Sequence, residues 1–212
     1  HVADIAYIGG HADIAVSLGI DKSLINSKRL LAYLDFLRAV KTDYELEQLR
    51  AANRLALLGH AAAKARFLEG GSEYEIHMAF LQTTQNLEDE CPYTNIVALN
   101  EKAAILHYQF KRKINEDKGR VLLIDAGCKV RAYGSDITRT SVSEDVHPEF
   151  RSLVTAMEAL ELALVDEVKP GKTYQSLHAS TLTRIASVLV DHKICTGEAA
   201  DLIELNIPQL FM

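Results

Sequence analysis

The sequence contains few cysteines, few prolines, no tryptophan and no long apolar run. No stretch approaches the roughly 20 apolar residues that span a bilayer, so we expect no membrane contact. Cys91, Cys128 and Cys195 are far apart, odd in number and form no Cys-x-x-Cys pair. These absences exclude a disulfide framework and a zinc knuckle, and they predict a protein of the reducing cytoplasm.

Basic charge is also scarce. The formal net charge is −6 at pH 7, with 23 Lys and Arg against 29 Asp and Glu. Proteins held on nucleic acid by phosphate contacts need a basic face, so no nucleic-acid partner is expected. Residues 1–4 lack an initiator Met and the basic region that opens a signal peptide. We therefore expect no signal peptide, and we expect the numbering to begin inside a longer gene product.

The sequence does contain enough apolar residues for a core, at 48% of 212. Near its start, residues 5–9 form a short apolar run that ends on a glycine, which is typical of a strand. Helical patterns follow at 11–19 and 30–39. Residues 1–40 are therefore predicted to be the end of an N-terminal α/β domain.

Two capping boxes predict the next two helices. The Thr42 hydroxyl is placed to accept from a free backbone N–H of the first turn, and the Glu45 carboxylate is placed to accept from the N–H of Thr42. Ser72 and Glu75 repeat this spacing. The first helix is predicted to end at the two glycines before Ser72, and the second at about Gln85.

The middle of the chain is predicted to form a sheet, and its last third to be helical. Short apolar runs bounded by turn residues predict strands at 95–99, 103–108, 121–127 and 131–140, with a polar connector at 111–119. Helical spacing predicts helices from Pro148 to about Pro170, at 174–190 and at 198–205. This order favours an α+β fold with helices packed on an antiparallel sheet.

Asp125 and Asp136 are the sharpest chemical feature. If their strands form a hairpin centred between Val130 and Arg131, the two carboxylates face each other with Cβ atoms roughly 5 Å apart. Two like charges at that distance beside an apolar strand must share a proton or hold a cation, and oxygen ligands suit Mg, Ca or Mn. The alternative is a pair of solvated surface carboxylates, which the spacing alone favours.

His107 is the second candidate, because it lies near the end of an apolar run. By itself it is better interpreted as a core or rim histidine bonded to a backbone carbonyl. Tyr93 and Tyr174 are candidates to line a pocket, although each is equally consistent with a half-buried tyrosine. The other histidines show no metal-ligand spacing; they include His60, His77, His147, His178 and His192.

Several short motifs in sequence order carry a family resemblance. Residues 124–127 (Ile-Asp-Ala-Gly) and 135–140 (Ser-Asp-Ile-Thr-Arg-Thr) resemble the first metal-ligand hairpin of the pita-bread metallopeptidases, the group of prolidase and aminopeptidase P. Residues 95–100 and 104–108 resemble the segment ahead of that hairpin, and residues 38–45 resemble the start of the catalytic domain. The resemblance runs from about residue 30 to the end and is nearest to bacterial prolidases, including those also called organophosphorus acid anhydrolases.

The resemblance implies a site with five metal ligands, of which this chain carries two. Asp125 would bind one metal ion and Asp136 would bridge both, and the family typically uses two Mn²⁺ ions. The remaining ligands, one His and two Glu, are expected beyond residue 212, because the family's next ligand motif follows a stretch like 210–212. A chain that ends there is expected to be truncated and inactive by itself.

The resemblance also implies a substrate and a reaction. His107 would face the substrate and assist at the scissile carbonyl, and Tyr93, Leu106 and Tyr174 would line the pocket. The implied reaction is hydrolysis of a dipeptide with a C-terminal proline by a metal-bridging hydroxide. An Xaa-Pro bond is a tertiary amide without an N–H, which general peptidases handle poorly.

Fold, assembly and alternatives follow from the same resemblance. Residues 41–212 would be the front part of a pita-bread catalytic domain whose C-terminal part is missing, and the full-length protein is expected to be a homodimer. The alternatives are an aminopeptidase P that acts on longer Xaa-Pro peptides, a creatinase-like protein without metal, and a non-catalytic domain that binds protein partners. The retained Asp pair weighs against the last two.

Overall fold

A computed structural model describes residues 5–115 and 118–211 of the chain. The helices are α1 (Ala12–Ser17), α2 (Lys28–Ala39), α3 (Asp43–Leu68), α4 (Glu73–Thr84), α5 (Pro148–Glu167), α6 (Tyr174–Asp191) and α7 (Ala199–Glu204). The strands are β1 (Ile96–Leu99), β2 (Val121–Ala126), β3 (Lys129–Val130), β4 (Tyr133–Gly134) and β5 (Ile137–Val142). Three predictions fall partly or wholly outside the described residues: the leaderless start at 1–4, positions 116–117 of the polar connector, and the last residue of the 210–212 stretch.

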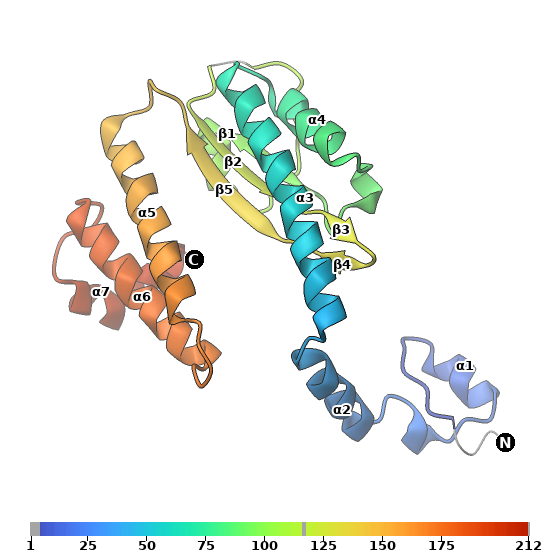
Figure 1. Cartoon of the computed structure of the whole chain (residues 1–212). Coiled ribbons are helices and arrows are strands. Elements are labelled where there is room, and N and C mark those ends of the chain that lie inside the picture. Colours follow the sequence, from blue (N-terminus) through green and yellow to red (C-terminus); the bar gives the residue numbers. More distant parts are fainter. Residues whose placement is uncertain (1–4, 116–117, 212) are drawn as a thin grey trace.

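The arrangement is an antiparallel sheet with helices on one face. Strands β1, β2 and β5 form the sheet in that order, and β3 and β4 pair at the tip of the β2–β5 hairpin. Helices α3 and α4 lie across one face of the sheet, and α5 to α7 stand beside β5 (Figure 1). The predicted order of helices, strands and helices, and the predicted α+β fold, are confirmed.

Ahead of α3 the chain forms short helices rather than a sheet. The two helices predicted there are confirmed as α1 and α2, but the strand predicted at 5–9 is wrong. Within the described part of that run, Tyr7 makes an isolated parallel bridge to Ile25. Its N–H donates to Leu24 O at 3.0 Å and its carbonyl accepts from Asn26 N–H at 2.8 Å. One paired residue does not make a ladder, so no strand forms.

Both predicted capping boxes are present. The Thr42 hydroxyl accepts from Glu45 N–H at 3.3 Å, and the Glu45 carboxylate accepts from Thr42 N–H at 2.7 Å. Ser72 and Glu75 repeat the exchange at 3.3 and 2.8 Å. These bonds satisfy N–H groups that a helix leaves free in its first turn. That local chemistry explains why α3 and α4 begin where the sequence predicts.

The main core lies between α3, α4 and the sheet. The helices approach closely at Gly59, where an added Cβ would lie 2.6 Å from the Phe80 ring. The largest side chains of this core belong to both helices and to all three strands of the sheet: Phe67, Ile76, Phe80, Val97, Leu99, Leu122, Ile124 and Ile137. A residue with any side chain at position 59 would force the two helices apart.

The sheet has one covered face and one open face. Leu122 and Ile124 of β2 are buried against the helices. Leu123 and Asp125 point the other way, because successive side chains of a strand alternate. Tyr108 packs against part of this second face and is itself buried. The open face therefore carries the polar and ionisable side chains of interest.

The strand predicted at 103–108 is wrong. Residues Asn100–Ala104 form a short 3-10 helix, η4, and His107 has a left-handed φ of 54°. The Asn100 side chain accepts from Arg120 N–H at 2.8 Å and holds the turn against the segment that leads into β2. The apolar run at this position suggested a strand, but a left-handed residue cannot continue a β-ladder. The segment is an ordered loop.

The C-terminal helices form a second apolar cluster of their own. Its buried residues come from α5, α6 and α7: Leu160, Ile185, Ala186, Leu189 and Leu202. Arg139 of β5 pairs with Glu161 of α5 at 3.3 Å and links this cluster to the sheet. The three helices predicted in this part are confirmed. Within the described ranges, no helix is both long and apolar enough to cross a membrane.

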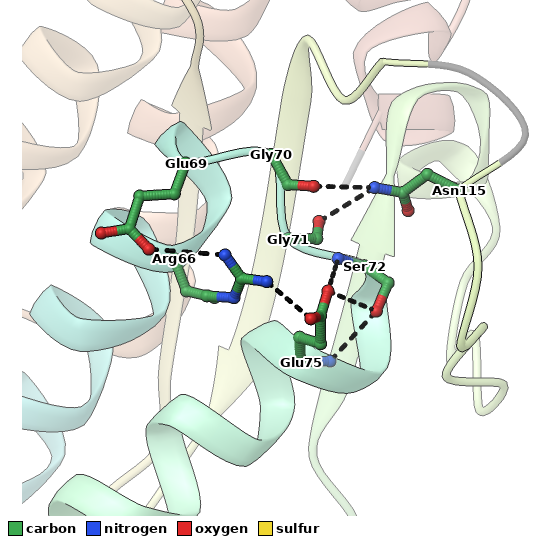
Figure 2. Close-up of polar contacts among 7 residues, drawn as sticks. All are labelled: Arg66, Glu69, Gly70, Gly71, Ser72, Glu75 and Asn115. Atoms are coloured by element: carbon green, nitrogen blue, oxygen red, sulfur yellow. Dashed lines mark hydrogen bonds and ion pairs between the residues drawn. The ribbon is translucent and has the colours of Figure 1, made fainter.

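The junction between α3 and α4 is held by a polar network (Figure 2). Arg66 pairs with Glu75 at 2.6 Å and with Glu69 at 3.4 Å. Asn115, from the connector after the η4 loop, donates to the carbonyls of Gly70 and Gly71 at 3.2 and 3.1 Å. The turn between the helices is therefore tied to a segment more than forty positions later in the chain.

We expect Glu75 to make part of the stability acid-sensitive. The Ser72 N–H bond, then Arg66, then the Ser72 hydroxyl lower the pKa of Glu75 from 4.5 to about 2. A carboxyl with a depressed folded-state pKa stabilises the fold above its unfolded pKa and loses that contribution as pH falls from about 4.5 to about 2. In Glu75→Gln, the midpoint of urea unfolding should therefore fall less steeply between pH 4.5 and about 2 than it does in the wild type.

A matched variant separates the effect of Arg66 from that of the Ser72 bonds. Arg66→Met keeps the Ser72 bonds, so the urea midpoint should still fall with pH much as it does in the wild type. Parallel urea-midpoint profiles for the wild type and Glu75→Gln between pH 5 and 2 would contradict the expectation.

Candidate functional site

The hairpin that carries the two aspartates is confirmed, but its register differs from the predicted one. Asp125 lies opposite Thr138, not opposite Asp136. Arg131 and Ala132 form the turn, both with left-handed φ values of 48° and 70°. A two-residue hairpin turn with φ above zero at both positions twists as the strands do, so the centre lies one residue later than predicted.

The second predicted strand, 131–140, is also divided. Its first residues form the turn and the short strand β4, and its remainder belongs to β5, which continues to Val142. Ser135 lies between these pieces: its N–H donates to Cys128 O at 2.9 Å, and its hydroxyl accepts from Cys128 N–H at 3.0 Å. The β2–β5 and β3–β4 pairs share one register, and Ser135 bonds to Cys128 between the two pairs.

The altered register still leaves both aspartates on one face. A shift by two residues preserves the side to which a side chain points, whereas a shift by one would reverse it. Asp125 and Asp136 accordingly line one cavity of about 390 Å³ on the open face of the sheet. The other lining residues come from β1 and its neighbouring loops: Tyr93, Thr94, Ile96, His107 and Gln109.

Tyr93 joins the two carboxylates. Its hydroxyl donates to Asp125 Oδ1 at 2.7 Å and also interacts with Asp136. Burial raises the pKa of Tyr93, and its bonds to the two carboxylates raise it further. The hydroxyl therefore keeps its proton and acts as a donor between two like charges, which would otherwise repel each other.

The donors present fit part of a site for a hard cation. Two carboxylates and a phenolic oxygen are the kind of ligands and neighbours that Mg²⁺, Ca²⁺ and Mn²⁺ accept. Among the residues that the structure describes, no group of three or more His, Cys, Asp or Glu side chains is placed to hold a metal. A complete coordination sphere would therefore need ligands beyond those of this hairpin.

The structure brings together some of the predicted substrate residues and not others. His107 lines the same cavity as Asp125, Asp136 and Tyr93. Leu106 and Tyr174 are not among its lining residues; they are 83% and 88% exposed, and Tyr174 lies at the start of α6. Their assignment to the substrate pocket stays a prediction.

Two histidines interpreted as ordinary have structural contacts. His60 of α3 is buried and its Nε2–H donates to Ala126 O at 3.1 Å. His77 of α4 is buried beside the Asn95 amide, with Nε2 at 3.4 Å. Burial lowers the pKa of both imidazoles. They help to fix the strand that carries Asp125, and the lining residues of its cavity do not include them.

Sequence reasoning missed three polar residues that support the site. Asn95 is fully buried and its side-chain oxygen accepts from Gly127 N–H at 3.4 Å. Ser135 bonds Cys128 across the hairpin, and Glu73 is a buried carboxylate at the start of α4. Most of their partners are distant in the sequence: Gly127 lies 32 positions from Asn95, and Arg112 lies 39 positions from Glu73. No local pattern pairs such distant positions. The only hint of these buried polar residues in the sequence is a polar residue at a helix start or within an apolar run.

Comparison with known proteins places this chain among the metallopeptidases. The sequence profile of metallopeptidase family M24 matches residues 47–200. The Xaa-Pro dipeptidases of Shewanella denitrificans and Shewanella oneidensis are each 42% identical over 210 residues, which cover 99% of this chain and 47% of the relative. The chain therefore spans about half the length of these curated relatives.

Solved structures give a consistent result. Pseudomonas aeruginosa aminopeptidase PepP matches with a TM-score of 0.77 and 26% identity, covering 94% of this chain and 48% of that one. Zinc-substituted E. coli aminopeptidase P in complex with product matches with a TM-score of 0.71 and 26% identity, covering 81% and 39%. The fold is therefore the front part of the pita-bread fold, as predicted.

We expect Gly127→Ala to disrupt the aspartate hairpin. A Cβ at Gly127 would lie 2.0 Å from the Ser135 carbonyl oxygen and 2.9 Å from Pro92 Cγ. Backbone cannot yield as a flexible side chain does, so the strands must separate. Overpacking costs about 1–3 kcal/mol, measurable as a lower urea midpoint of the full-length protein.

The matched control is Gly10→Ala, where an added Cβ meets no heavy atom within 4 Å. It should change stability by less than about 0.5 kcal/mol, as for a surface substitution. A Gly127→Ala protein as stable as Gly10→Ala would show that the close approach is relieved without disturbing the hairpin.

Proposed function

The chain belongs to metallopeptidase family M24, and on that basis we propose that the full-length protein carrying it is an Xaa-Pro dipeptidase. Such an enzyme hydrolyses dipeptides with a C-terminal proline. The observation that carries the proposal is one cavity that holds Asp125, Asp136 and His107 together. The 42% identity to curated Xaa-Pro dipeptidases over 99% of this chain supports the same substrate class.

In this proposal Asp125 and Asp136 would be ligands of two divalent metal ions. Manganese is proposed from the family resemblance, and carboxylate oxygens suit it as they suit other hard divalent cations. When bound, such ions activate water near neutral pH and stabilise negative charge on the substrate. Tyr93 would keep its proton and orient Asp125 through their 2.7 Å bond. Orientation of a ligand by a hydrogen-bonded neighbour typically changes affinity or activity 10- to 100-fold.

His107 is proposed as the residue that assists at the scissile carbonyl. It is exposed to the cavity, so its imidazole can reach a substrate bound beside the aspartates. An imidazole N–H could donate to an oxygen that gains charge in the transition state. Tyr93, Leu106 and Tyr174 are proposed to line the pocket for the two residues of the dipeptide.

The dipeptidase is preferred to its alternatives. Aminopeptidase P structures share the fold, but at 26% identity against 42% for the dipeptidases. A protein-binding domain without catalysis would have no use for two carboxylates that line one cavity. Cleavage of longer Xaa-Pro peptides remains a distinct outcome of the test below.

Domain division, location and assembly belong to the same proposal. Residues 1–40 would end an N-terminal α/β domain and residues 41–212 would begin the catalytic domain. The position of α1 and α2 away from the sheet supports this division (Figure 1). A cytoplasmic location is supported by two buried free thiols, at Cys91 and Cys128. A homodimer is proposed from the family alone.

The test is hydrolysis of Gly-Pro by the full-length protein with Mn²⁺, together with its metal content. We expect metal-dependent cleavage. Asp125→Asn and Asp136→Asn should each lower it at least about 100-fold and reduce the bound metal, because a ligand oxygen is replaced by a neutral amide. Asp89→Asn, an exposed carboxylate a few residues ahead of Tyr93, is the matched control and should retain activity.

Three results would contradict parts of the proposal. Faster cleavage of Gly-Pro-Gly than of Gly-Pro would indicate an aminopeptidase P. A metal content that neither substitution reduces would show that Asp125 and Asp136 are not metal ligands. A wild-type protein that binds no metal and cleaves nothing would make the non-catalytic domain the leading hypothesis.

A further inference from the structure

Glu73 is a buried carboxylate at the start of α4, and it does not line the aspartate cavity. The residue is only 1% exposed. Its Oε1 accepts from Leu99 N–H at 3.1 Å, and its Oε2 accepts from the Tyr108 hydroxyl at 2.9 Å and from Arg112 N–H at 3.0 Å. Burial of a carboxylate is costly unless it is bonded in this way.

All three donors come from one stretch of chain, residues 99–112. Leu99 is the last residue of β1, Tyr108 lies in the loop that follows η4, and Arg112 ends that loop. The Arg112 carbonyl returns a bond by accepting from Tyr74 N–H of α4 at 3.0 Å. Asn115, just beyond, holds the carbonyls before α4 (Figure 2). The first turn of α4 is therefore the anchor for the whole loop.

The anchored residue Tyr108 directly follows His107. Tyr108 is turned inward, where it packs against Ile96 and Ala98 of β1. Burial, then its bond to Glu73, raises the pKa of the Tyr108 hydroxyl, so it remains a donor. His107 is turned outward into the cavity of Asp125. Of these two neighbours, Tyr108 is buried and His107 is exposed.

The backbone at His107 needs such support. Its φ of 54° lies in the left-handed region, which a residue with a side chain adopts at a cost. A conformation of this kind persists only where the surroundings hold it. In this loop the holding contacts on either side are the Lys102 carbonyl, which accepts from Ile105 N–H at 3.0 Å, and the Tyr108 bond to Glu73.

We propose that Glu73 is a positioning residue, which holds His107 against the substrate through Tyr108 and Arg112. The inference rests on the proposed function, in which His107 assists at the scissile carbonyl. Small displacements of an assisting group matter, because about 1 Å of misplacement can lower a rate on the order of 100-fold. Glu73 itself touches neither substrate nor metal.

The test is Glu73→Gln in the full-length protein, assayed on Gly-Pro with Mn²⁺. Glutamine has nearly the same volume but only one acceptor oxygen, so its NH₂ group must face either Leu99 N–H or the Tyr108 hydroxyl and Arg112 N–H, and at least one anchoring bond is lost. We expect kcat to fall about 10- to 100-fold, while KM changes by less than about threefold, because His107 would act on the transition state.

The matched control is Glu75→Gln. Glu75 lies in the same helix turn, and its described bonds go to Ser72 and Arg66 rather than to the loop. This variant also loses a bond at the start of α4. Its kcat should stay within about twofold of the wild type when both are folded, because the loop keeps its anchor.

A double-mutant cycle decides whether Glu73 acts through His107. In a His107→Ala background, Glu73→Gln should cause little further loss, since coupled residues are not additive. An equal loss in both backgrounds, or a Glu73→Gln enzyme within about threefold of the wild type, would overturn the proposal. If Glu73→Gln fails to fold, Tyr108→Phe replaces it, with the same expectation of a kcat loss that disappears without His107.

Failure of the proposed function would be recognised separately. If the wild type cleaves no Xaa-Pro peptide, amide hydrogen exchange of residues 105–112 still tests the anchor. Exchange should be faster in Glu73→Gln than in Glu75→Gln, because the loop loses at least one of its bonds to residue 73. Equal exchange in the two variants would reject the anchor regardless of activity.

Discussion

The loop beside the candidate site depends on one buried negative charge, that of Glu73. A carboxylate removed from water must be satisfied by the protein, and its donors come from the end of β1, from Tyr108 and from the far end of the loop. Its place at the start of α4 adds the favourable field of free helix N–H groups. A single side chain thus connects a helix on the covered face to a loop on the open face, so the position of one constrains the other.

The sheet separates stability from chemistry by its two faces. On the helix side, alternate residues of β2 such as Leu122 and Ile124 are buried in the main core. On the open side, the intervening Asp125 meets Tyr93 and shares a cavity with Asp136. Because successive side chains alternate, the same rigid strand serves both purposes. The buried face fixes the strand, and the strand fixes the side of the sheet on which the carboxylate lies.

In the proposed function, chemistry would occur at the cavity of Asp125 and Asp136. The relatives that are 42% identical are about twice as long as this chain, and the hairpin offers two carboxylates rather than a full set of ligands. Within this chain, Tyr93 donates to Asp125 at 2.7 Å and lines the same cavity as both carboxylates. The site is therefore organised on the sheet by contacts within this chain, with room for ligands from elsewhere.

The sequence by itself determined the features that arise from neighbouring residues. Two capping boxes set the starts of α3 and α4, helical spacing set α5 to α7, and the alternation of β2 put Asp125 opposite the core. Tertiary structure decided the rest. The hairpin register depended on left-handed backbone at Arg131 and Ala132, and neither position is a glycine that would indicate such a turn. The run at 103–108 was apolar enough for a strand, but bonds from Asn100 to distant residues hold it as a turn. Glu73 read as an ordinary helix-start residue, because its partners lie 26 to 39 positions away and only the folded chain brings them to it.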